Sequence, residues 1–157
     1  MTCFCERLQL MNPENKESEF RIFNSTNSVL VEITEKCYTG CEHCYKGSIV
    51  STKGNAVPVD ILEKRFEWIS RYTDVNNITL LGGEPLLHPN LPEIVDSLHE
   101  KGFIVRFITS GKISKDPVEQ RNYEYLLNQY EKGKVEIELS YQPERNEKSF
   151  EQMYSDL

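Results

Sequence analysis

The chain reads Val29-Leu-Val-Glu-Ile-Thr-Glu-Lys-Cys37-Tyr-Thr-Gly-Cys41-Glu-His-Cys44 near its beginning. The β-branched run at the start of this stretch predicts a strand, and the three cysteines follow it in a loop. Three thiols this close together can hold one metal centre from a single loop. Closed structural metal sites usually have four protein ligands, so three ligands predict an open coordination position, where chemistry can take place.

Strand and helix signals alternate from residue 28 onward. Such alternation predicts an α/β fold with parallel strands and right-handed crossovers. We expect strands at 29–33, 77–81, 103–108 and 134–139, helices at 58–72, 90–102 and 116–133, and a short helix from Asn146 to the end.

Helical spacing of apolar residues predicts which faces of two helices point inward. In the helix at 116–133, Glu119 is placed for a capping-box contact with the residue before the helix. The inward residues are expected to be Ile61, Leu62, Phe66, Ile69 and Tyr72 in one helix and Tyr123, Leu126, Leu127 and Tyr130 in the other.

Unusual residues follow every predicted strand. In parallel sheets, catalytic and binding residues gather at the carboxyl ends of the strands. Gly82-Gly-Glu-Pro85 follows the second strand, Thr109-Ser-Gly111 the third, and Ser140 the fourth. Taken alone, Gly82–Pro85 is equally typical of a tight turn. At a strand end, its two glycines let the backbone approach a ligand closely, and Glu84 supplies a carboxylate that can hold an ammonium group. Pro85 stiffens the exit from this turn.

The three clustered thiols favour an iron–sulfur cluster over zinc. Zinc would need a second Cys or His pair, and Cys3 and Cys5 lie about thirty residues upstream. Extra ligands or a mobile terminus remain alternative readings of these two cysteines. His88 and His99 have no partner at a useful spacing, and we expect His99 on a helix surface.

Composition restricts the class of protein. The chain has 157 residues, a hydrophobic fraction of 38% and a net charge of −7, which suit one globular domain without a nucleic-acid partner. No stretch approaches the roughly 20 apolar residues of a membrane span, and no signal-peptide core begins the chain. We therefore expect a cytoplasmic protein without a membrane partner, in which five cysteines suit metal ligation better than disulfides.

Cys-x3-Cys-x2-Cys after the first strand, together with Gly-Gly-Glu-Pro after the second, resembles the radical S-adenosylmethionine (radical SAM) superfamily. The resemblance covers roughly residues 28 to 145 and implies a partial TIM-type barrel. About four parallel βα units of the usual six are present. We accordingly expect residues 1–27 to be an N-terminal extension and residues 28–157 to be a partial radical SAM core domain.

The resemblance also implies a mechanism. A 4Fe–4S cluster chelates S-adenosylmethionine through its open iron and cleaves it reductively to a 5′-deoxyadenosyl radical, which abstracts hydrogen from a substrate. It implies an electron donor such as flavodoxin or ferredoxin, and we favour a peptide or protein substrate. Carried over, the cluster ligands are Cys37, Cys41 and Cys44, and the residues at S-adenosylmethionine are His43, Gly82, Gly83, Glu84, Pro85, Ser110 and Ser140.

The sequence departs from the family in its number of strands. Four are predicted where six are expected, and the glycine-rich stretch that often contacts adenine is missing. A truncated longer enzyme or a short protein that completes its barrel with a partner would explain this, and we favour truncation. The alternative function is a non-catalytic iron–sulfur or zinc module that needs a partner chain.

Overall fold

A single parallel sheet forms the centre of the computed structural model, which describes residues 28–41, 44–47 and 51–140. The strands β1 (Ser28–Thr34), β2 (Asn77–Gly82), β3 (Ile104–Thr109) and β4 (Val135–Leu139) lie side by side in chain order, and each neighbouring pair is parallel. The connecting helices are α3 (Val59–Tyr72), α4 (Leu91–Glu100) and α5 (Pro117–Glu131). Four strands alternating with helices in an open sheet confirm the predicted α/β fold of partial-barrel type.

The predicted strands and helices differ from the observed ones only at their ends. The predicted helix after Gly82–Pro85 begins at Leu91, and it is preceded by a short 3-10 helix, η2 (Pro85–Leu87), that the sequence pattern did not reveal. The helix predicted from Asn146 onward lies outside the described residues. Local residue preferences therefore determined most of this architecture.

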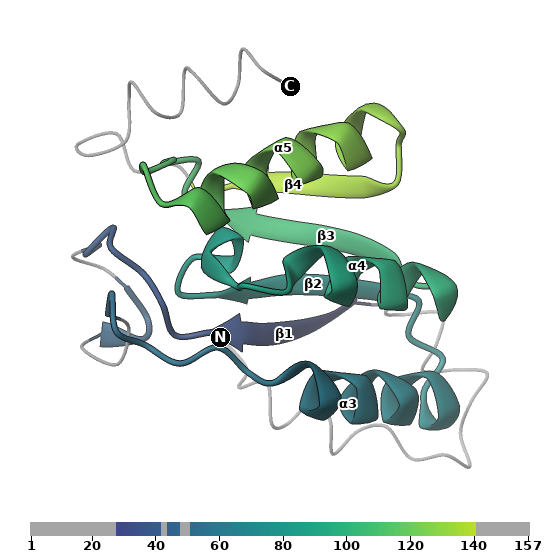
Figure 1. Ribbon diagram of the computed structural model, residues 1–157. Coiled ribbons are helices and arrows are strands. Elements are labelled where there is room, and N and C mark those ends of the chain that lie inside the picture. Colours follow the sequence, from purple (N-terminus) through teal and green to yellow (C-terminus); the bar gives the residue numbers. More distant parts are fainter. Residues whose placement is uncertain (1–27, 42–43, 48–50, 141–157) are drawn as a thin grey trace.

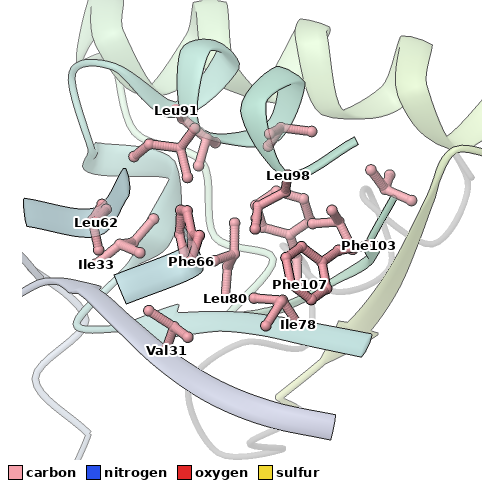
Figure 2. Close-up of a cluster of buried hydrophobic side chains, with 14 of the residues drawn as sticks. Val31, Ile33, Leu62, Phe66, Ile78, Leu80, Leu91, Leu98, Phe103 and Phe107 are labelled. Carbon is pink, nitrogen blue, oxygen red and sulfur yellow. The ribbon is translucent and has the colours of Figure 1, made fainter. Parts of the chain in front are cut away.

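The three helices cover one face of the sheet (Figure 1). Along each strand, alternate residues point toward this face, since successive side chains of a strand point to opposite sides. Leu80 and Phe107 belong to this set and are fully buried. Figure 2 shows the resulting apolar core; its labelled residues are Val31, Ile33, Leu62, Phe66, Ile78, Leu80, Leu91, Leu98, Phe103 and Phe107.

The predicted inward face of α3 is only partly confirmed. Leu62, Phe66 and Ile69 are buried, whereas Ile61 is 37% exposed and Tyr72 is 64% exposed. Tyr72 packs on the neighbouring Trp68 instead, with 5.6 Å between the ring centroids. A narrower apolar stripe is enough because α3 lies on the outer side of β1, at the edge of the sheet (Figure 1).

The predicted inward face of α5 is only partly confirmed. Leu126 is buried and Tyr123 packs partly buried against the core, as expected, but the other buried positions of α5 are Glu119, Asn122 and Gln129. Tyr130 is exposed. Polar residues can occupy a buried face when hydrogen bonds satisfy them, and a period calculated from apolar residues alone does not reveal such a face.

Within the described residues, no helix is long and apolar enough to cross a membrane.

Candidate functional site

The cysteine loop begins where β1 ends, and a returning segment closes it at its base. Glu35 N donates to Asn55 O at 2.8 Å, Ser51 N donates to Glu35 O at 3.2 Å, and Cys37 N donates to Ser51 O at 3.0 Å. A Cβ atom on Gly54 would lie 2.5 Å from the carbonyl carbon of Glu35, so only glycine allows this approach. The base of the loop is thus a backbone-paired unit.

The three thiols lie half-buried on this loop, and none of them forms a disulfide within the described residues. Thr39 N donates to Cys37 Sγ at 3.4 Å, and a tight turn brings Cys44 N to 3.2 Å from Cys41 O. Among the residues that the structure describes, no three Cys, His, Asp or Glu side chains are grouped so that they could hold a metal ion. The thiols are therefore near one another along the loop but are not arranged as a ligand set.

The donors on the loop nonetheless suit a thiolate-bound metal centre. Thiol-rich sets select iron–sulfur clusters or zinc, and many metal sites acquire their geometry only when the metal binds. Thr39, between Cys37 and Cys41, has a buried Oγ1 with no hydrogen-bond partner among the described residues. Since buried hydroxyls are normally paired, this one indicates that an acceptor completes the loop.

The Gly82-Gly83 turn packs directly against the start of the cysteine loop. Gly83 N donates to Thr34 O and Glu84 N donates to Lys36 O, both at 2.7 Å. A Cβ on Gly82 would lie 2.3 Å from Thr34 O, and one on Gly83 would lie 2.2 Å from Lys36 O. The two glycines are thus required for a close approach of two strand ends, in addition to any approach of a ligand.

The side chain of Glu84 is buried between the ends of β2 and β3. Its Oε1 accepts hydrogen bonds from Thr109 Oγ1 at 2.7 Å and Leu86 N at 3.4 Å. Its Oε2 accepts from Ser110 N at 3.0 Å and Ser110 Oγ at 2.8 Å. Four donors of the protein therefore bond to this carboxylate, and the role expected for it toward an ammonium group stays a prediction.

Burial and hydrogen bonding act on Glu84 in opposite directions. Desolvation raises the pKa of the carboxyl group, while the bonds from Thr109, Ser110 and Leu86 favour the charged form and partly offset that rise. The net direction is upward. A carboxyl group in this position links two strand ends, and its charge is kept away from solvent.

Ser110 and Ser140 have different surroundings. The hydroxyl of Ser110 donates to Glu84 and also accepts from Lys112 N at 3.3 Å, so it belongs to the turn after β3. Ser140 is exposed at the end of β4, and its N–H donates to Thr109 O at 2.8 Å. Both serines lie at strand ends as predicted. Their role as ligand contacts stays a prediction.

The sequence did not reveal the structural hydrogen bonds of two polar residues near the strand ends. Asn122 Nδ2 donates to Leu86 O and to His88 O, both at 2.8 Å, and so fastens α5 to η2. His88 bonds Val57 O through Nε2 at 2.9 Å, and its Nδ1 accepts from Asn90 N at 3.1 Å. A histidine that lacks partners in the sequence thus has two in the fold.

His99 also has a structural contact, since its Nε2 lies 3.0 Å from Lys134 O at the start of β4. His43, Cys3 and Cys5 lie outside the described residues, so their predicted roles stay predictions. The structure therefore brings Cys37, Gly83 and the end of β3 together where the carboxyl ends of the strands lie (Figure 1).

Parts of this chain are similar in sequence to known proteins. An L-lysine 2,3-aminomutase of Fusobacterium nucleatum subsp. nucleatum is 34% identical over 59 residues, which cover 38% of this chain and 14% of that protein. The putative protein YfkA of Bacillus subtilis (strain 168) is 40% identical over 100 residues, covering 60% and 25%. An S-adenosylmethionine-dependent nucleotide dehydratase of a Thermoplasmatales archaeon (strain ISO4-H5) is 31% identical over 103 residues, covering 66% and 34%.

The matched segments span between about a seventh and a third of the length of these relatives. The family model described as Radical SAM superfamily matches residues 31–129, from β1 almost to the end of α5. That range includes the cysteine loop and the Gly82–Pro85 turn, and it covers more than half of the chain. The chain therefore belongs to the Radical SAM superfamily.

Proposed function

We propose that this chain forms the cofactor-binding part of a radical SAM enzyme. The observation that carries the proposal is the contact between two loops: Gly83, after β2, packs against Lys36 and Cys37 at the start of the cysteine loop. The two sequence motifs that define the resemblance are thus adjacent in space as well as present in the sequence. A cofactor held by the thiols would lie beside the Gly82–Pro85 turn.

The thiolates of Cys37, Cys41 and Cys44 would hold a 4Fe–4S cluster. When bound, such a cluster supplies one electron that cleaves S-adenosylmethionine to a 5′-deoxyadenosyl radical. The protein contributes the loop that orders the three thiols, the Thr39 N–H directed at Cys37 Sγ, and the buried Thr39 hydroxyl. Hydrogen bonds to cluster sulfur atoms raise the reduction potential of iron–sulfur centres, so both Thr39 groups would favour the reduced state.

The turn after β2 would bind the amino group of S-adenosylmethionine through its backbone. An ammonium group donates hydrogen bonds and needs acceptors. The N–H groups of Gly83 and Glu84 are used in bonds to the cysteine loop, and the Glu84 carboxylate is used by the end of β3. The backbone carbonyl oxygens of Gly82 and Gly83 are therefore the acceptors that the proposal assigns, with Pro85 fixing the direction in which the chain leaves.

The remaining ligand contacts also belong to the proposal. His43 would lie near the adenine, and Ser140, exposed at the end of β4, would reach the ribose or carboxylate. Ser110 would act by holding Glu84 rather than through a free hydroxyl. An electron donor such as flavodoxin or ferredoxin would supply the reducing equivalent.

Two of the similar proteins are named for different substrates, lysine in one case and a nucleotide in the other. A substrate therefore does not transfer from them to this chain. The peptide or protein substrate expected from the sequence stays a prediction, and hydrogen abstraction from such a substrate would follow S-adenosylmethionine cleavage.

Anaerobic reconstitution with iron and sulfide tests the proposal. The expected product is a brown protein that releases 5′-deoxyadenosine from S-adenosylmethionine when it is reduced. The variant Cys41→Ala should lose the cluster absorbance and the product. The double variant Cys3→Ala/Cys5→Ala is the matched control, because it removes two thiols outside the predicted ligand set, and it should keep both.

Metal analysis separates the proposal from its alternative. Zinc without sulfide in anaerobically purified protein would indicate a zinc module. A cluster that Cys41→Ala leaves intact would contradict the ligand assignment. A cluster that never yields 5′-deoxyadenosine would indicate a non-catalytic iron–sulfur module.

A further inference from the structure

Tyr38, next to the first cysteine, connects the cysteine loop to a helix far along the chain. Its hydroxyl lies within hydrogen-bond distance of two acceptors, Glu119 Oε1 at 2.5 Å and the carbonyl oxygen of Lys112, which share its single proton. Lys112 Nζ also lies 5.8 Å from the centre of the Tyr38 ring.

Glu119 is a rigid acceptor for this contact. It is fully buried in the first turn of α5, where the helix dipole favours a negative charge. Its Oε2 accepts hydrogen bonds from Ser114 N at 2.7 Å and from Ser114 Oγ at 2.5 Å. Half of the capping box expected from the sequence forms, because Glu119 N donates to Asp116 Oδ1 at 3.3 Å. The reciprocal bond does not form, because Asp116 N donates to Ser114 Oγ and the Glu119 carboxylate bonds to Tyr38.

The same loop has a second side-chain anchor, and it is more exposed. Tyr45 OH donates to Glu32 Oε1 at 2.9 Å, and Lys46 Nζ lies 2.5 Å from Glu32 Oε2. The side chain of Glu32 is 45% exposed, and surface ion pairs contribute little to the position of a chain. The bond between the half-buried Tyr38 and the fully buried Glu119 therefore contributes more to the placement of Cys37 and Cys41.

The contact of Tyr38 with Lys112 also joins the cysteine loop to the turn that follows β3. Lys112 follows Thr109-Ser110-Gly111, and Lys112 N donates to Ser110 Oγ, which in turn donates to Glu84. Hydrogen bonds thus run from the cysteine loop through the turn after β3 to the turn after β2. Tyr38 is the point at which the cysteine loop joins this network by a side chain.

We infer that Tyr38 and Glu119 are positioning residues that set the cysteine loop against the ends of β2 and β3, so that a cluster on the thiols meets S-adenosylmethionine held at Gly82–Glu84. The inference rests on the proposed function. Removing the anchor should leave three thiols able to bind iron but should misplace them relative to the S-adenosylmethionine site.

The variant Tyr38→Phe removes the hydroxyl and keeps the ring over which Lys112 lies. Tyr125→Phe is a matched control, because Tyr125 OH also donates to a carboxylate, Asp96 Oδ1 at 2.8 Å, in a bond that joins α5 to α4. In the metal-free protein, Cys37 and Cys41 should react several-fold faster with iodoacetamide in Tyr38→Phe than in the wild type or the control. This measurement needs no cofactor.

The reconstituted proteins provide the second measurement. Tyr38→Phe should bind as much iron and sulfide as the wild type. Its dissociation constant for S-adenosylmethionine, followed by the change in the electron paramagnetic resonance spectrum of the reduced cluster, should rise about tenfold, which corresponds to about 1.4 kcal/mol. Tyr125→Phe should match the wild type in both respects.

The outcomes separate the inference from the proposed function. Equal alkylation rates in Tyr38→Phe and wild type would overturn the inference even if the cluster and its chemistry are confirmed. Equal affinities for S-adenosylmethionine would overturn it as well. If the wild type binds no iron and sulfide, the proposed function fails and the inference fails with it, whatever the alkylation rates are.

Discussion

Glu84 provides a stringent test of how the strand ends are held together. The variant Glu84→Ala removes the acceptor of four hydrogen bonds from Thr109, Ser110 and Leu86. The two hydroxyl groups among these donors can rotate toward other acceptors, but the N–H groups of Ser110 and Leu86 cannot. Each buried donor left without an acceptor costs about 1–3 kcal/mol, so we expect about 3 kcal/mol of lost stability in total.

Glu84→Gln is the informative companion variant. Its carbonyl oxygen can still accept from Ser110, and no charge has to be buried. Its amide group can donate to Thr109 Oγ1 but leaves the N–H of Leu86 without an acceptor. We therefore expect a loss of about 1 kcal/mol, about 2 kcal/mol smaller than for alanine. Glu93→Ala, at an exposed glutamate on α4, is the control and should change stability by no more than about 0.5 kcal/mol.

Urea unfolding of the metal-free proteins measures these differences through the transition midpoint at an unchanged m-value. A loss below about 1 kcal/mol for Glu84→Ala would refute the reasoning that this carboxylate links the two strand ends. The reconstituted Glu84→Gln protein adds a functional measurement. If its affinity for S-adenosylmethionine is abolished while its fold is intact, the carboxylate itself is a ligand, and the assignment of the amino group to backbone carbonyls is wrong.

Two further predictions concern Thr39 and His88. Thr39→Val removes a buried unpaired hydroxyl, so urea unfolding should show the metal-free protein to be stabilised or unchanged. In the reconstituted protein, the same variant should lower the reduction potential of the cluster in a redox titration. An unchanged potential would contradict the proposed contact. For His88, burial lowers the pKa below the ordinary value of 6.5, so the unfolded chain takes up the proton first as the pH falls. The contribution of His88 to the free energy of unfolding should therefore be fully present above about pH 6.5 and should decrease below it. The urea midpoints at pH 7.5 and pH 5.5 should differ more for the wild type than for His88→Gln. Equal differences would show that His88 does not cause the pH dependence.

The pattern of strands and helices was accessible from the sequence because local preferences and turn residues are encoded over a few neighbouring positions. Pro58, Asn90 and Gly102 mark helix ends within one or two residues of where they lie in the structure. The identity of the strand ends followed from the alternation itself, since parallel strands place their carboxyl ends at one edge. These signals act over a few residues, so the element ends that they predict lie close to those in the structure.

Errors occurred where polar groups are buried. The inward face of α5 was assigned from apolar residues, whereas Glu119 and Asn122 lie there because partners from the cysteine loop and η2 satisfy them. For Glu84, the sequence did not reveal the donors at the end of β3 that bond to its carboxylate, and its expected role toward an ammonium group stays a prediction. In both cases the partner lies far away in the chain, so spacing along the sequence carries no information about it.

The sequence by itself determined the order of strands and helices and the superfamily, because the three cysteines and the Gly82–Pro85 turn are contiguous motifs whose chemistry depends on residue type. Only the tertiary structure decided what holds those motifs together. Tyr38 and Glu119 are 81 positions apart, and Glu84 and Thr109 are 25 apart. Such bonds form only after the crossovers have brought the strand ends side by side, so their existence is a property of the packed sheet rather than of any local segment.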